Sequence, residues 1–281
     1  MREYSEPTPV DVQAFSAGRI LKESWEICMK YFGALVMPLV LIILACMPSV
    51  FIIPGKPGEA LNNILLAIFM PIGVMGLHHS VLRLKSEGKL PTFAQTFSFG
   101  SEYWGRGFRI GLILGLYTFL VIIGGMIAAA IPFVPGTMLV DKYPIPGAIL
   151  VGLGVLLFLG ALAWFAARSC LAYSAMADGL TSATRAYDVA WEITKTNTKK
   201  TLSLGFALLG ITVIIIFFFI LAAAIMTGFQ IADEDAITAV LTFAGILVYL
   251  FGLAYIHVCL CLTYQALKPA PKEENQLPGA N

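Results

Sequence analysis

Residues 202–226 read LSLGFALLGITVIIIFFFILAAAIM, and this stretch decides the class of the fold. It contains no Asp, Glu, Lys or Arg. About twenty apolar residues in a helix are enough to cross the hydrocarbon core of a bilayer. A spanning segment has no water to satisfy its backbone, so it must be a helix or part of a closed barrel. Barrel strands alternate apolar and polar residues, whereas this run is continuous, so the sequence predicts a transmembrane helix.

Five further segments have the same character and also lack charged residues: 33–53, 61–82, 110–131, 147–167 and 237–265. The composition agrees, because 58% of the residues are hydrophobic and 12% are charged. Soluble domains have about 45–50% apolar and about 25% charged residues. We therefore predict an all-α integral membrane protein with six transmembrane helices. The net charge of +1 provides no field that would favour nucleic acid as a partner.

The distribution of Lys and Arg predicts the orientation, since cytoplasmic loops carry an excess of both residues. All but two of the eighteen fall on the side that holds both termini; the exceptions are Lys56 and Lys142. Both termini should therefore be cytoplasmic. Four tryptophans, which favour the headgroup level, fall near this same interface: Trp25, Trp104, Trp164 and Trp191.

An amphipathic helix is expected before the first predicted span. Plotted at 100° per residue, Arg19 and Lys22 share the charged face, whereas Trp25 lies on the apolar face. Such a helix beside a bilayer should lie in the interface plane. The pattern returns before the fifth span, where a shift of 166 residues gives six identities in the twelve positions 16–27. The corresponding residues there include Arg185 and Trp191.

The chain is thus predicted to contain three parallel repeats, 11–85, 91–178 and 179–267, within one membrane domain at 11–267. Each repeat has a cytoplasmic interfacial helix followed by an out-and-back hairpin. In the second, weaker copy, Trp104 takes the place of Trp25. We call the three interfacial helices the collar and expect its key residues to be Arg19, Lys22, Trp25, Trp104, Arg185, Trp191 and Lys195. Residues 1–10 form an N-terminal tail, and the proline-rich, polar residues 268–281 form a tail expected to be disordered.

Two motifs resemble a group of bacterial six-span families. They are IPFVPG at 131–136 and ADGLTSA at 177–183, the second followed by Ala190, Trp191 and Asn197. The group includes the YciC-like inner-membrane proteins and the membrane domain of some glycerophosphodiester phosphodiesterases. The resemblance covers about 105–210, and residues 137–146 look inserted relative to the family pattern. It implies location in the bacterial inner membrane, whereas the phosphodiesterase activity is not carried over because that domain is absent here.

Few residues are candidates for chemistry. His257 and Cys261 share a helix face at i and i+4, and His78 and His79 lie at a similar predicted depth, so a four-ligand metal site is conceivable. Ordinary packing is the favoured interpretation for buried cysteine. His78 and His79 could instead form a pH-responsive pair or proton relay, although interfacial histidines bonded to water or phosphate are the favoured interpretation. We therefore assign no metal, no cofactor and no catalytic residue.

The third predicted span carries a ridge of small residues, formed by Gly107, Gly111 and Gly115. Small residues let membrane helices approach closely. The ridge is predicted to pack within the chain, with the seam of a homo-oligomer as the alternative.

Three functions stay open at this point. The favoured one is a non-enzymatic protein that organises lipid, with anionic phospholipid as a candidate, or a membrane-protein partner through the collar. The second is a carrier or pore for a lipid-like or neutral solute, with a polar lining supplied by Tyr117, Thr118, Thr212, Thr242, Tyr249 and Tyr255. The third is a membrane-embedded enzyme or metal site.

Overall fold

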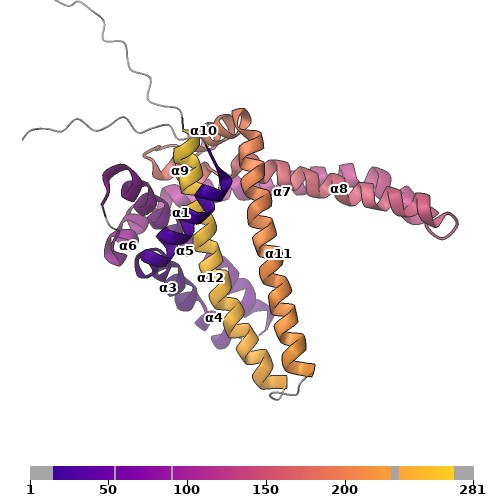
Figure 1. Cartoon of the computed structure of the whole chain (residues 1–281), viewed down its shortest axis with the longest axis horizontal. Coiled ribbons are helices and arrows are strands. Elements are labelled where there is room, and N and C mark those ends of the chain that lie inside the picture. Colours follow the sequence, from indigo (N-terminus) through magenta and orange to yellow (C-terminus); the bar gives the residue numbers. More distant parts are fainter. Residues whose placement is uncertain (1–14, 54, 90, 229–233, 269–281) are drawn as a thin grey trace, which may run out of the picture.

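The computed structural model describes residues 15–53, 55–89, 91–228 and 234–268, and this part of the chain is helical without any strand (Figure 1). Five stretches are long and apolar enough to cross a membrane: Lys56–Glu87, Trp104–Leu139, Pro144–Ala177, Thr198–Ala222 and Ala244–Leu267. The predictions of an all-α class and of a membrane protein are thereby confirmed. The predicted tails, apart from residue 268, lie outside the described residues.

The first predicted span, 33–53, is not one continuous helix. It is divided into α2 (Phe32–Leu35), α3 (Met37–Cys46) and α4 (Pro48–Ile52). A proline lies in the first turn of both α3 and α4, and proline cannot donate the backbone hydrogen bond that would continue a preceding helix. The broken segment packs along α5 (Lys56–Glu87), where the side chains of Leu39 and Ile42 lie against Gly73.

A proline inside a helix is tolerated elsewhere in the chain. Pro71 lies within the continuous helix α5, where its ring disturbs the carbonyl groups of the preceding turn. The indole Nε1–H of Trp104 donates to the backbone oxygen of Ile68 at 2.6 Å and so supplies a donor beside this proline. Trp104, predicted as an interface residue, therefore also ties the start of α7 (Trp104–Leu139) to α5.

Three short amphipathic helices form the collar: α1 (Ala17–Lys30), α6 (Phe93–Glu102) and α10 (Ala183–Thr196). Each begins with a hydroxyl side chain that accepts a backbone N–H three residues ahead, which is the preferred N-cap arrangement. The caps are Ser16, Thr92 and Ser182. After a break of one residue, each collar helix leads directly into the apolar segment that follows.

The apolar helices form hairpins that leave the collar in different directions (Figure 1). Helix α7 packs along α8 (Pro144–Ser169), and this pair extends to the right in Figure 1. Helices α11 (Thr198–Gly228) and α12 (Glu234–Leu267) run downward in the same view. The short helix α9 (Ala172–Ala177) connects the end of α8 to α10 and contacts α5, α7 and α12.

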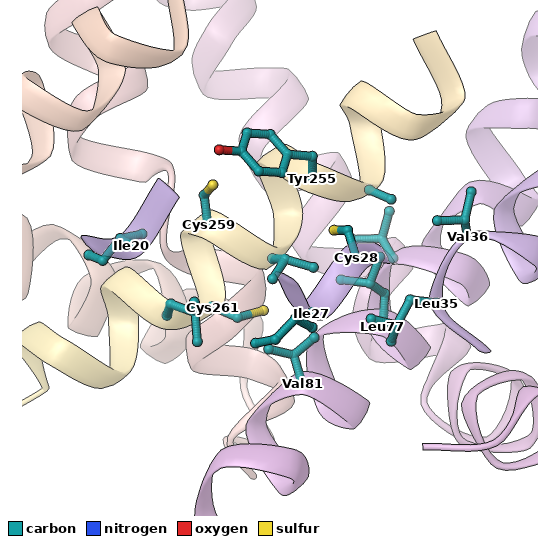
Figure 2. Packing of buried hydrophobic residues seen from close by; sticks show 14 of the residues in the cluster. Ile20, Ile27, Cys28, Leu35, Val36, Leu77, Val81, Tyr255, Cys259 and Cys261 are labelled. Carbon is teal, nitrogen blue, oxygen red and sulfur yellow. The ribbon is translucent and has the colours of Figure 1, made fainter. Parts of the chain in front are cut away.

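The buried core lies at the collar end of the hairpins. Figure 2 shows one cluster, in which Cys28 of α1, Leu77 and Val81 of α5, and Cys259 and Cys261 of α12 pack together. Farther out, large apolar side chains stay exposed, including Ile127, Leu156, Phe217 and Ile220, which are 60–68% exposed. Exposing such side chains to water costs about 1.5–3 kcal/mol each, so these surfaces fit hydrocarbon rather than water.

Candidate functional site

A buried polar junction joins the second half of each of the three hairpins, namely α5, the α8–α9 segment and α12. His78 of α5 is fully buried, its Nδ1 lies 3.0 Å from Ser174 Oγ of α9, and its Nε2 lies 2.8 Å from His257 Nδ1 of α12. Each imidazole nitrogen donates or accepts according to its tautomer. The three side chains therefore form one hydrogen-bonded chain whose protons can be arranged in either direction.

Cys261 lies beside this junction. Its Sγ is 4.0 Å from Ser174 Oγ and 3.9 Å from the backbone oxygen of His78. The facing ring nitrogens of His78 and His257 bond to each other, so one donates its N–H and the other accepts with its lone pair. A metal ion held between the two rings would need a free lone pair on both nitrogens. Among the described residues, no group of three or more His, Cys, Asp or Glu side chains is arranged to hold a metal ion.

The two adjacent histidines point to different places. Whereas His78 enters the junction, the His79 ring stacks on Phe99 of α6. His79 therefore does not join His78, His257 and Cys261 in a common site. The sequence interpretation of His78 and His79 as a pair is not supported by their geometry; successive helical residues are about 100° apart, which separates their side chains.

Two cavities lined by both polar and apolar groups flank the stack of His79 on Phe99. The smaller, about 260 Å³, lies among α5, α6, the end of α9 and α12, and includes Arg83, Asp178 and Gln265. The larger, about 590 Å³, lies between α5 and α6. Pro91, Ala94 and Phe99 form part of its lining. The other lining residues carry charged or hydrogen-bonding groups: His79, Ser80, Arg83, Lys89, Gln95, Ser98 and Glu102.

Two separate groups of ion pairs lie beside these cavities. Arg83 Nη2 and Lys89 Nζ lie 3.0 and 2.6 Å from the same oxygen of Glu87. On the other side of the smaller cavity, Asp178 accepts a hydrogen bond from Tyr264 at 2.9 Å and pairs with Lys268. The contacts of Asp178 connect the end of α9 to the end of α12, and no local sequence pattern indicated the link between Asp178 and Tyr264.

The collar residues occupy two kinds of position. Arg19, Lys22, Arg185 and Lys195 are exposed, and Lys195 Nζ lies 4.0 Å from Glu192. The aromatic members make tertiary contacts: Trp25 is 52% exposed yet meets the rings of Phe251 and Tyr255 edge-on. Charge thus faces outward, while the aromatic side chains join the collar to the hairpins.

Trp191 joins α10 to α8. Its ring meets Trp164 at 5.2 Å between centroids, and the guanidinium of Arg168 lies over both rings at 5.8 and 5.9 Å. The Thr194 hydroxyl donates to the backbone oxygen of Arg168 at 2.9 Å.

On the same helix, burial raises the pKa of Tyr187, and the neighbouring Tyr117 and Asp188 raise it further.

The glycine ridge of α7 meets different surroundings along its length. A Cβ on Gly107 would meet Met75 and Pro71 of α5, and one on Gly111 would lie 2.8 Å from the Tyr173 hydroxyl. Nothing lies within 4 Å of the corresponding position on Gly115. Two of the three glycines therefore permit close packing within the chain.

The residues proposed to line a carrier do not converge on the cavities described above. Tyr255 donates to the backbone oxygen of Leu21 at 3.0 Å, Thr118 and Thr212 bond back to their own helices, and Tyr249 is 64% exposed. Tyr117 contacts the ring of Tyr187, while the side chain of Thr242 lies outside the described ones. A third cavity of about 330 Å³, among α8, α11 and α12, is lined mostly by apolar residues.

Comparison with known proteins adds no relative: no family model, no curated protein and no solved structure matches the chain. The resemblance to the YciC-like group stays a prediction based on the two quoted motifs.

Proposed function

We propose that this chain is a non-enzymatic, multi-pass protein of the bacterial inner membrane that organises phospholipid through its cytoplasmic collar. In this arrangement the broken segment α2–α4 is the sixth crossing, both termini are cytoplasmic, and the collar helices are equivalent parts of three repeats. The observation that carries the proposal is the shared design of α1, α6 and α10. Each has a hydroxyl cap and leads directly into an apolar segment.

The collar charges support an interaction with lipid headgroups. Exposed Arg19 and Lys22 of α1 and Arg185 and Lys195 of α10 lie beside helices whose apolar side chains fit hydrocarbon. Each Lys or Arg near an anionic membrane surface contributes about 1 kcal/mol of attraction. A group of such residues on one protein gathers several anionic lipids, whereas isolated charges do not.

The test is lipid clustering in vesicles that contain the full chain and a self-quenching anionic lipid. The double variant Lys22→Glu and Lys195→Glu should reduce the quenching caused by the native protein, with helix content unchanged by circular dichroism. The matched control is Lys56→Glu with Lys142→Glu, which makes the same charge change at two separate hairpins and should leave quenching unchanged. Equal quenching by the native protein and both variants would refute the proposal.

A further inference from the structure

The larger cavity, between α5 and α6, contains an uncompensated charge of each sign. Arg83 and Lys89 share the single carboxylate of Glu87, so one positive charge is left over at this end. Glu102 also lines the cavity and makes no ion pair with any described residue. A ligand that carries one negative and one positive group therefore complements both ends of the cavity.

We propose that this cavity binds the phosphoethanolamine headgroup of a phospholipid, with the phosphate at Arg83 and Lys89 and the ammonium at Glu102. Guanidinium and ammonium side chains bind phosphate through charge-assisted hydrogen bonds. The primary ammonium of the ligand donates hydrogen bonds to the Glu102 carboxylate. A quaternary choline group has no N–H to donate, and a glycerol headgroup has no positive charge.

The size and lining of the cavity suit this ligand. Ser98, one turn before Glu102 on α6, also lines the cavity and adds a hydroxyl that can donate to phosphate. The cavity volume of about 590 Å³ leaves room for the glycerol backbone beyond the headgroup.

The surroundings favour a lipid over a water-soluble molecule with the same headgroup. Phe93 and Phe97, each 39% exposed, stack on each other on α6. Arg83 and Lys89 lie at the end of the candidate span α5, where its apolar sequence gives way to charge. The assignment rests on the proposed function in one respect, because the collar must lie at headgroup level.

The experiment is native mass spectrometry of the full chain released from bilayers that contain equal amounts of phosphatidylethanolamine, phosphatidylglycerol and phosphatidylcholine. We expect the ethanolamine lipid to be retained about tenfold more than the other two, the effect of one charge-assisted hydrogen bond. Glu102→Gln should abolish this preference. Since Glu102 is exposed, the substitution leaves the fold intact.

Matched variants test the phosphate end. Lys89→Gln should lower retention of all three lipids, whereas Lys85→Gln, which loses an ion pair with Glu23 of α1 instead, should not. Equal retention of the three lipids by the native protein, or a preference that persists in Glu102→Gln, would overturn the assignment. A preference that persists in the Lys22→Glu and Lys195→Glu variant shows that the cavity works even if the collar does not cluster lipid.

A second arm distinguishes the source of the headgroup. In lipid-free micelles, glycerophosphoethanolamine should bind the full chain weakly, because it lacks the acyl chains that hold a lipid beside α5 and α6. Equal affinity for this soluble compound and for the lipid would assign the cavity to a water-soluble ligand and overturn the lipid assignment.

Discussion

The close approach of α5 and α6 gives a sharp prediction about the substitution Gly76→Ala. A Cβ at this position would overlap the backbone oxygen of Thr96 and lie 3.0 Å from its carbonyl carbon. Carbon atoms in optimal contact are about 3.5–4.0 Å apart. Because the obstructing atoms belong to the backbone of α6, no side-chain rotation relieves the overlap, and the two helices must separate.

The cost has three parts. Overpacking of this kind destabilises by about 1–3 kcal/mol. Separation also breaks the buried hydrogen bond between Ser80 Oγ and Thr96 Oγ1, 2.8 Å long, for a net loss of about 1 kcal/mol. The higher helix propensity of alanine returns about 1 kcal/mol. The free energy of unfolding of Gly76→Ala should therefore fall by about 1–3 kcal/mol.

The assay is reversible unfolding of the full chain in mixed micelles, followed by circular dichroism. Gly115→Ala is the matched control, since it makes the same change in a transmembrane helix with nothing within 4 Å; its stability should be unchanged or slightly higher. A double-mutant cycle adds a second readout, because Ser80→Ala should cost less in the Gly76→Ala background, where its bond is already broken. Equal stability of Gly76→Ala and Gly115→Ala would refute the reasoning.

Three further predictions follow from other parts of the chain. A single cysteine at Lys56 should react with an impermeant reagent on intact cells, and one at Lys89 should not; the reverse pattern would overturn the proposed orientation. Burial raises the pKa of the Cys28 thiol from 9.0 to about 12, with Cys259 adding to the shift. Because the thiolate is the reactive form, Cys28 of the native chain should be alkylated at pH 8 on the order of a thousandfold more slowly when folded than when unfolded, as measured by mass spectrometry of its peptide. His257→Phe should lower the unfolding free energy by about 1–3 kcal/mol, since it leaves the buried Nε2 of His78 without its hydrogen-bond partner, and unchanged stability would contradict the junction.

The long apolar helices were predictable because hydrocarbon leaves a continuous apolar segment only one regular conformation. The positions of α1 and α10 were also accessible, since amphipathic periodicity is a local property of the sequence. The division of 33–53 was harder to foresee. Pro38 and Pro48 lie at breaks, yet Pro71, Pro132 and Pro135 lie inside continuous helices. Whether a proline ends a helix therefore depends on what packs around it.

The candidate sites were less predictable than the helices. His78 and His257 are 179 residues apart in sequence, and Ser174 carried no feature that marked it as their neighbour. The larger cavity required knowledge that α6 folds back along α5, which depends on the glycine contact at Gly76. Sequence periodicity places a side chain on a face of its own helix, but it does not say which helix faces it.

The junction of His78, Ser174 and His257 explains how three separate hairpins can hold a fixed arrangement. In lipid, apolar packing alone provides little drive for helix association, because the lipid tails are as apolar as the side chains. Hydrogen bonds between membrane helices contribute about 0.6 kcal/mol each on average, which is weak but directional. Since each of the three residues comes from the second half of a different hairpin, only one register satisfies all of them together. The junction therefore determines the relative position of the hairpins more than it adds to their stability. It fixes α5 in the position from which α6 closes the larger cavity.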